Sequence, residues 1–306
     1  SPNQQNWQPY NKLKRPGEVR LLSYQAMAHG ADTCLFFQMR QSIAGQEKFH
    51  GAVISHAGHE NTRVFREIST IGKEFGQIGD LFLEGRIDAK VGIFFDWNNW
   101  WSLELSSGPS KDMNYLNTVY KYYKAFYDRN IPLDILAVDS DVSKYQVLVA
   151  PMLYMMKEGV AEKIIEFVKK GGTFIATTMT GLVDENDRAI FGEYPGKLRD
   201  LLGIWVEETD ALFPDEKNIM MMLPDARFPK ASYDCSFLCD IIHSRGAKTI
   251  ALYGADFYKD MPCVTENSFG NGMAYYIGTQ PEDDFLADLV ERIARNTDLK
   301  PVYQSS

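Results

Sequence analysis

Side chains that could bind a polar ligand are concentrated between residues 40 and 50. Arg40, Glu47 and His50 follow the short apolar run Cys34–Phe37. Glu47 and His50 are three residues apart, so a helical turn in this loop would bring a carboxylate and an imidazole to one ligand. Together they offer hydrogen-bond acceptors and a donor to hydroxyl groups. Such pairs are also common on solvated loops, so the spacing alone leaves both interpretations open.

Metal and thiol chemistry have less support. His56 and His59 lie close to His50 in the sequence, but a zinc site needs three or four converging ligands and nothing else nearby supplies them. Cys235 and Cys239 are a similarly weak pair, and four scattered cysteines are too few for a disulfide framework. We therefore predict no metal, no cofactor and a reducing, cytoplasmic location.

The composition excludes two classes of partner. The chain has 306 residues with 45% hydrophobic content, enough for about two domains with buried cores. Its formal net charge of -9 and the lack of a basic cluster argue against nucleic acid, because phosphate binding needs a basic patch. No apolar run approaches the roughly 18 residues that span a bilayer, so we expect no membrane partner.

The elements expected to position Glu47 and His50 are two helices and one strand. Pro16 to Gly30 predicts a helix, and apolar residues from Val64 to Phe75 at spacings of three and four predict a second one that starts near Asn61. The run Cys34–Phe37 is typical of a strand buried on both faces. In an α/β barrel, polar groups beyond the carboxyl end of such a strand face the mouth of the site.

A new alternation of strands and helices follows a predicted linker at Gly79–Arg86. Apolar runs predict five strands at Val91–Phe95, Ile135–Val138, Val147–Ala150, Thr173–Ala176 and Tyr275–Ile277. Apolar faces at helical spacing predict helices around residues 116–126, 160–167 and 285–293. The alternation predicts a doubly wound, mostly parallel sheet. The segment from Glu207 to Gly272 has no clear pattern, and Gly270-Asn271-Gly272 is a turn that lacks the third glycine of a dinucleotide fingerprint.

Several strings in the first 60 residues resemble, in order and spacing, the last part of the catalytic barrel of family 42 β-galactosidases. They are Asn6–Trp7, Pro16–Leu21, Ala28–Asp32, Phe36–Ser42 and Glu47–His50. The resemblance implies that residues 1–88 are the C-terminal part of a (β/α)8 catalytic domain and that residues 89–306 are an α/β trimerisation domain. It also implies retaining hydrolysis of terminal β-galactosides by two carboxylates about 5 Å apart.

The resemblance assigns roles to four residues. Trp7 is similar to the tryptophan beside the galactosyl unit, Phe37 to an aromatic wall of that subsite, and Glu47 and His50 to the pair that hydrogen-bonds galactose hydroxyls. These roles agree with the chemistry of a sugar, whose apolar faces stack on rings and whose hydroxyls need oriented partners. The family's nucleophile lies just before the Asn6–Trp7 pair and its acid/base glutamate lies further upstream. We therefore expect both catalytic glutamates to be absent from this chain, which would be inactive alone.

The second domain leaves other functions open. Its loop Asp96–Trp101 carries three tryptophans, which indicate a sugar platform, a subunit contact or rings folded back on their own domain. The resemblance favours a subunit contact in a homotrimer. One alternative is a non-catalytic oligomerisation module. A second alternative is a nucleotide-binding or amidotransferase-like enzyme on the doubly wound sheet, which looks like the glutamine amidotransferase fold. Thr177–Gly181, where the amidotransferase nucleophile would lie, holds no cysteine. No phosphate-binding glycines stand at a strand-to-helix turn, as nucleotide binding would require.

Overall fold

The computed structural model describes residues 1–303, which divide into two compact units between Asp88 and Ala89. The first unit contains α1 (Glu18–Ala28), a short 3-10 helix (Gln46–Phe49) and α2 (Arg63–Phe82). α1 follows Gly17 and buries Val19, Ser23 and Met27, one residue per turn, on a single face. At the start of α2, the hydroxyl of Thr62 accepts a hydrogen bond from the backbone N–H of Phe65. Both predicted helices of this unit are confirmed.

The predicted strand Cys34–Phe37 is wrong for this structure. The segment is not paired as a strand, and Leu35 is 88% exposed rather than buried. A strand needs a neighbour to satisfy its backbone groups, and the nearest pairing in the described part of this unit is an isolated bridge between Arg40 and Ile54. The predicted linker is also displaced, because α2 continues through Phe82 before the irregular segment 83–90.

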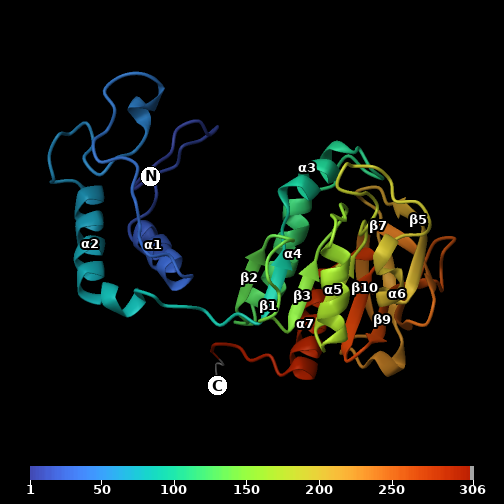
Figure 1. Ribbon diagram of the computed structural model, residues 1–306. Coiled ribbons are helices and arrows are strands. Elements are labelled where there is room, and N and C mark those ends of the chain that lie inside the picture. The colour runs from blue at the N-terminus through green and yellow to red at the C-terminus, as the bar shows by residue number, and fades with distance from the viewer. Residues whose placement is uncertain (304–306) are drawn as a thin grey trace. The chain divides into compact units, whose positions relative to one another are not determined.

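The second unit is built on one eleven-stranded sheet (Figure 1). One half is parallel, with strand order β2, β1, β3, β4, β10, which is the order of a doubly wound sheet. The bounds of these strands are β1 (Val91–Phe94), β2 (Leu133–Leu136), β3 (Val147–Ala150), β4 (Thr173–Thr177) and β10 (Gly272–Ile277). All residues of β1, β3 and β4 are buried, as apolar runs in a sheet covered on both faces should be.

The other half of the sheet is antiparallel, so the prediction of a mostly parallel sheet is wrong. Its strands are β5 (Ile204–Ala211), β6 (Asn218–Met222), β7 (Ser232–Ser244), β8 (Lys248–Tyr253), β9 (Pro262–Phe269) and β11 (Thr279–Pro281). Apart from β11 and the start of β5, they lie between Glu207 and Gly272, where the sequence shows no clear pattern. Only Gly278 separates β10 from β11, and β11 pairs with β7, so strands β7, β6, β8, β9 and β10–β11 close into a small barrel.

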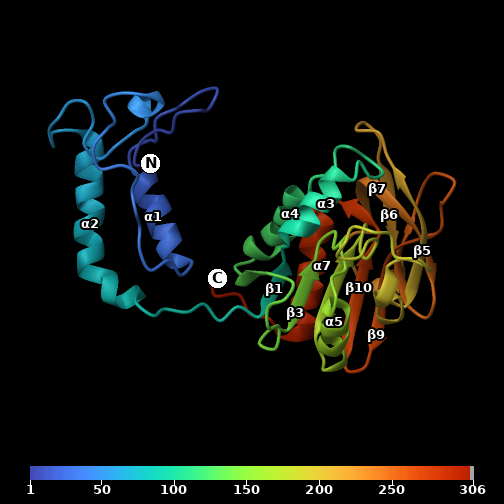
Figure 2. The same ribbon diagram turned by 45° about the horizontal axis from the view of Figure 1, so that its top comes forward.

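Helices cover both faces of the sheet, and the sheet separates two hydrophobic cores. α4 (Tyr115–Tyr127) and α7 (Asp283–Thr297) contribute to one core, and α5 (Val160–Lys169) and α6 (Arg199–Leu202) contribute to the other. Figure 2 shows α5 in front of the sheet and α7 behind it. Short 3-10 helices at Gly196–Leu198 and Pro224–Ala226 lie in the connections. None of the helices in residues 1–303 is both long enough and apolar enough to cross a membrane.

The tryptophan-rich segment is a helix and not a loop. α3 spans Trp97–Leu105, and the side chain of Asp96 caps it by accepting a hydrogen bond of 3.2 Å from the N–H of Asn98. The turn at Gly270-Asn271-Gly272 is confirmed, because it joins the antiparallel strands β9 and β10.

Candidate functional site

His50 is the most constrained of the four predicted sugar-binding residues. Its side chain is 5% exposed, and its Nδ1 lies 2.7 Å from Oδ1 of Asn6. The Asn6 amide is oriented by a second bond of 2.7 Å, which its Nδ2 donates to the carbonyl of Gln46. Because Oδ1 of Asn6 can only accept, Nδ1 of a neutral His50 carries the proton. Nε2 is then left as an acceptor for a ligand hydroxyl.

A close backbone approach holds the segment of Asn6 against His50. The N–H of Gly51 donates to the carbonyl of Gln4 over 2.9 Å. A Cβ atom at Gly51 would lie 2.8 Å from the backbone nitrogen of Gln4, so only glycine allows the two segments to approach this closely. The position of Asn6 beside His50 therefore depends on residues that are far apart in the sequence.

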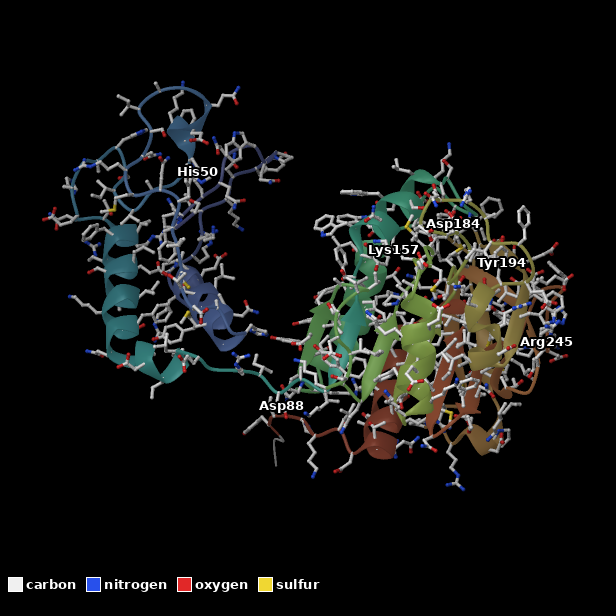
Figure 3. The ribbon with its side chains drawn as sticks, in the orientation of Figure 1. His50, Asp88, Lys157, Asp184, Tyr194 and Arg245 are labelled. Atoms are coloured by element: carbon white, nitrogen blue, oxygen red, sulfur yellow. The ribbon has the colours of Figure 1, made fainter. Side chains whose placement is uncertain are left out.

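Two aromatic rings pack on the His50 ring. The Trp7 ring centroid is 5.4 Å away at a tilt of 44°, and the Phe37 centroid is 5.2 Å away with edge-to-face geometry. Trp7 remains 64% exposed and Phe37 52% exposed, so each ring presents a large apolar surface beside a buried acceptor. Figure 3 shows His50 among the loops at the end of the unit where α1 and α2 begin.

Glu47 lies on the 3-10 helix that ends just before His50. The backbone carbonyl of Glu47 accepts a hydrogen bond of 2.9 Å from the N–H of His50. Side chains three residues apart on such a helix project from the same side, so the helical turn required for their convergence is present. Among the described residues, none donates a hydrogen bond to the partly exposed Glu47 carboxylate.

Other residues near this group have different environments. Arg40 is exposed, and its backbone forms an isolated parallel bridge with Ile54. His56 Nε2 bonds the carbonyl of Ser42 at 2.8 Å, and His59 accepts from the N–H of Asn61. Within residues 1–303, no three His, Cys, Asp or Glu residues are grouped closely enough to hold a metal ion. Asn6 was given no role from the sequence, although an amide beside Trp7 was a usable signal.

The second unit contains a fully buried carboxylate, Asp240. It accepts hydrogen bonds from the hydroxyls of Thr178 at 2.9 Å, Thr209 at 2.7 Å and Tyr276 at 2.6 Å. Burial raises the pKa of Asp240 to about 6, and the three hydrogen bonds counteract part of that shift. The group is enclosed and satisfied, so it is a structural network and not a substrate site.

The cysteines of the second unit are equally enclosed. Cys235, Cys239 and Cys263 are buried free thiols, and burial raises the pKa of Cys263 well above its ordinary value. At the end of β4, the hydroxyl of Thr177 accepts from the N–H of Met152, and the hydroxyl of Thr178 donates to the carboxylate of Asp240. Among the described residues, this unit therefore offers no exposed thiol nucleophile.

The α3 segment forms an aromatic patch on the second unit. The rings of Trp97 and Trp100 have centroids 5.3 Å apart, and those of Trp97 and Trp101 are 6.0 Å apart. Trp97 is 56% exposed and Trp101 is 55% exposed. Lys157, labelled in Figure 3, forms an ion pair of 2.7 Å with the helix-capping Asp96 and holds the start of α3 in place.

Both parts of the chain are similar to known proteins. Residues 89–300 match the family described as "Beta-galactosidase trimerisation domain", and residues 1–78 match the family described as "Beta-galactosidase". The chain is 51% identical over 302 residues to beta-galactosidase BgaP of a Planococcus species and 45% identical over 306 residues to beta-galactosidase LacZ of Lactobacillus acidophilus. These alignments cover 99% and 100% of this chain but 45% of each relative.

Solved structures show the same relation. The crystal structure of beta-galactosidase from Bacillus circulans sp. alkalophilus superposes with a TM-score of 0.97 at 51% identity, covering 100% of this chain and 45% of that chain. The beta-galactosidase from a Rahnella species superposes with a TM-score of 0.94 at 41% identity, covering 98% of this chain and 44% of that one. The chain thus spans about half the length of the relatives that it matches. The two family matches together cover nearly all of its residues, and the chain belongs to the family 42 β-galactosidases of the glycoside hydrolases.

Proposed function

We propose that residues 1–88 supply part of the galactose subsite of a retaining β-galactosidase and that residues 89–306 assemble its subunits. In this proposal Trp7 and Phe37 are apolar walls, Glu47 and His50 bind sugar hydroxyls, and the two catalytic glutamates lie outside these 306 residues. The observation that carries the proposal is the His50 arrangement, in which a buried imidazole has one nitrogen engaged by Asn6 and an aromatic ring on two sides.

The chemistry of a sugar explains why these groups belong together. A galactose hydroxyl donates to Nε2 of His50, and the Glu47 carboxylate accepts from one or two further hydroxyls. The apolar face of the sugar ring covers part of the exposed surface of Trp7 or Phe37. A single carboxylate cannot act as both nucleophile and acid, so Glu47 is a binding residue here. The substrate class, terminal β-galactosides, is supported by the names of the relatives.

A chimera tests the binding roles. The preceding part of the Bacillus circulans enzyme is joined to residues 1–306, and hydrolysis of a nitrophenyl β-galactoside is measured. Glu47→Gln and His50→Ala should each lower kcat/KM by roughly 10- to 100-fold, because hydrogen bonds to charged or buried groups are worth about 1.5–3 kcal/mol. Trp7→Ala should raise KM, whereas Tyr10→Ala, which removes a ring that is 92% exposed, should leave kinetics unchanged.

The isolated chain provides the complementary measurement. Residues 1–306 alone should not turn over the nitrophenyl substrate above the buffer rate, since paired carboxylates are needed for protonation and for charge stabilisation. Turnover by the isolated chain that Glu47→Gln abolishes would make Glu47 catalytic and overturn the assignment. Wild-type kinetics in the chimeras with Glu47→Gln, His50→Ala and Trp7→Ala would show that these three residues do not belong to the subsite.

The second unit is proposed to form a homotrimer through the α3 patch, and the family description and the exposure of Trp97 and Trp101 support this. A non-catalytic oligomerisation module remains the second candidate function. This second function is favoured if the chimera assembles but Glu47→Gln and His50→Ala leave its kcat/KM unchanged. A cytoplasmic location is also proposed, because buried free thiols such as Cys235 and Cys239 are typical of reducing compartments.

A further inference from the structure

A polar cleft of about 630 Å³ opens in the second unit at the edge where β3, β4 and β10 begin. Its polar side chains come from four separate segments of the chain and are Gln146, Thr173, Ser268, Asn271, Asn296 and Thr297. Three glycines, Gly171, Gly270 and Gly272, also line it, and Tyr275, Met273 and Ile293 add apolar surface. This volume is within the usual range for small-molecule sites.

Every residue that lines the cleft is uncharged. The ion pair between Arg292 and Glu266, at 2.7 Å, lies next to Tyr275 and is internally neutralised. Two helices also end here: α5 ends at Lys169 beside Gly171, and α7 ends at Thr297, one on each face of the sheet (Figure 1). The partial negative charge of each helix C-terminus is offset by a basic residue of its last turn, Lys169 in α5 and Arg295 in α7, so the helix ends favour neither an anion nor a cation. The lining itself has no charged side chain to pair with either ion.

Several hydrogen-bonding groups at the cleft are unused by the protein. The side chains of Gln146, Ser268 and Asn271 make no hydrogen bond to any described residue. Their backbones are nevertheless fixed, because the carbonyl of Gln146 accepts from Thr173 at 2.9 Å and the N–H of Asn271 donates to Lys169 at 3.1 Å. Amides and hydroxyls both donate and accept, which suits a ligand that carries many hydroxyl groups.

The floor of the cleft is rigid. A Cβ atom at Gly272 would lie 2.2 Å from the carbonyl oxygen of Val168, and one at Gly270 would lie 2.7 Å from Cα of Lys169. The turn between β9 and β10 therefore packs directly on the end of α5, and no side chain fits between them. Asn271 at the tip of this turn is held in place before any ligand arrives, which lowers the entropic cost of binding.

We propose that this cleft is a second saccharide site, which binds a neutral oligosaccharide through Gln146, Ser268 and Asn271 and packs its apolar face near Met273. The inference does not depend on the proposed galactose subsite in the first unit. An uncharged lining, unused amide and hydroxyl groups, and charge-balanced helix ends together favour a neutral polyhydroxylated ligand over a phosphate, a carboxylate or an ammonium group.

The test uses the intact 306-residue chain with lactose and a linear galactotriose as probes. Binding of each sugar is measured by isothermal titration calorimetry and by ligand-observed NMR. We expect dissociation constants of about 1–10 mM, weak as befits a shallow polar cleft. The double variant Gln146→Ala/Asn271→Ala should weaken binding about tenfold, because it removes both hydrogen-bonding amides. Asn117→Ala, an exposed amide elsewhere on the same unit, is the matched control.

The variant His50→Ala distinguishes sugar binding at the cleft from sugar binding at the proposed galactose subsite of the first unit. Sugar binding that survives His50→Ala and is lost in the double variant supports the cleft. Binding that is lost in His50→Ala and unaffected in the double variant overturns it, as does the absence of any binding at 50 mM sugar, roughly five times the weakest constant expected. Sulfate that binds the cleft more tightly than lactose would also overturn the inference, because it would show that the cleft prefers an anion to a neutral ligand.

Discussion

His50 and Asp240 are both buried and polar, but their surroundings give them different roles. His50 has one ring nitrogen engaged by Asn6 and two half-exposed rings beside it, so its second nitrogen can meet a ligand. Asp240 accepts three hydroxyl hydrogen bonds inside a closed core. A buried group with a vacant acceptor next to exposed apolar surface indicates binding, whereas a fully satisfied one indicates stability.

Asp240 predicts an unusual pH dependence of stability. Its pKa is raised to about 6 in the folded state against 3.8 in a free side chain, so the folded state binds this proton more tightly. The associated stability is fully present below about pH 4 and is lost as the pH rises through 6, by on the order of 3 kcal/mol. Asp240→Asn should remove this slope, which urea unfolding between pH 4.5 and 7.5 would measure.

The slope of the unfolding free energy against pH is compared, and not its absolute value, because Asp240→Asn also changes the network of Thr178, Thr209 and Tyr276. Asp215→Asn, at an exposed position, should leave the pH profile of the parent unchanged. A profile for Asp240→Asn that is parallel to the parent's between pH 4.5 and 7.5 would show that Asp240 is ionised at an ordinary pKa.

At the scale of elements, Asn99 connects α3 to the loop that follows β3. It is completely buried, its Nδ2 donates to the carbonyl of Met152 at 3.0 Å, and its Oδ1 accepts from the N–H of Met155 at 2.8 Å. Among the described residues, the N–H of Met155 has no other partner, whereas the carbonyl of Met152 also accepts from the N–H of Tyr154 at 2.7 Å. This amide therefore attaches α3 to the loop that follows β3, together with the ion pair between Lys157 and Asp96.

Asn99→Ala should lower the free energy of unfolding by about 1–3 kcal/mol, since it leaves the buried N–H of Met155 without a partner. Equilibrium urea unfolding measures the loss, and hydrogen exchange at the Met155 amide should accelerate. Asn117→Ala, on the exposed face of α4, should change stability by no more than about 0.5 kcal/mol. A loss below about 1 kcal/mol for Asn99→Ala would mean that water replaces the amide.

At the scale of the whole molecule, the proposed assembly rests on exposed aromatic surface. Trp97 and Trp101 each expose more than half of their side chains on one helix, and tryptophan is enriched at the centres of interfaces. Burying two such rings per subunit contributes several kcal/mol to association, at roughly 25 cal/mol per Å² of apolar surface. The chain should therefore self-associate at concentrations that are routine in solution measurements.

We expect the 34.8 kDa chain to sediment as a trimer at tens of micromolar, a range in which weak interfaces still register. Trp97→Ser/Trp101→Ser should shift it to monomer, measured by analytical ultracentrifugation. Phe191→Ser/Phe213→Ser removes two other exposed rings and should leave the trimer intact. A monomeric parent chain, or a double tryptophan variant that remains trimeric, would contradict an interface at α3.

The elements that could be predicted from the sequence are those that local periodicity determines. α1, α2, α5 and the buried strands β3 and β4 were predicted within a few residues, because their apolar spacing and their glycine or threonine ends act within one element. α3 was missed although Asp96 was a usable capping signal. The antiparallel half of the sheet was missed because pairing direction depends on strands that are distant in sequence.

The sequence by itself determined the residue types of the candidate subsite and, through its motifs, the family. Only the tertiary structure decided that Asn6 fixes the proton on Nδ1 of His50 and that Trp7 and Phe37 pack on its ring. It likewise decided that Cys34–Phe37 is not a strand, because strand formation needs a partner that local sequence does not specify. Side chains 44 residues apart, such as Asn6 and His50, meet only after the intervening chain has folded, so their hydrogen bond leaves no local pattern to read.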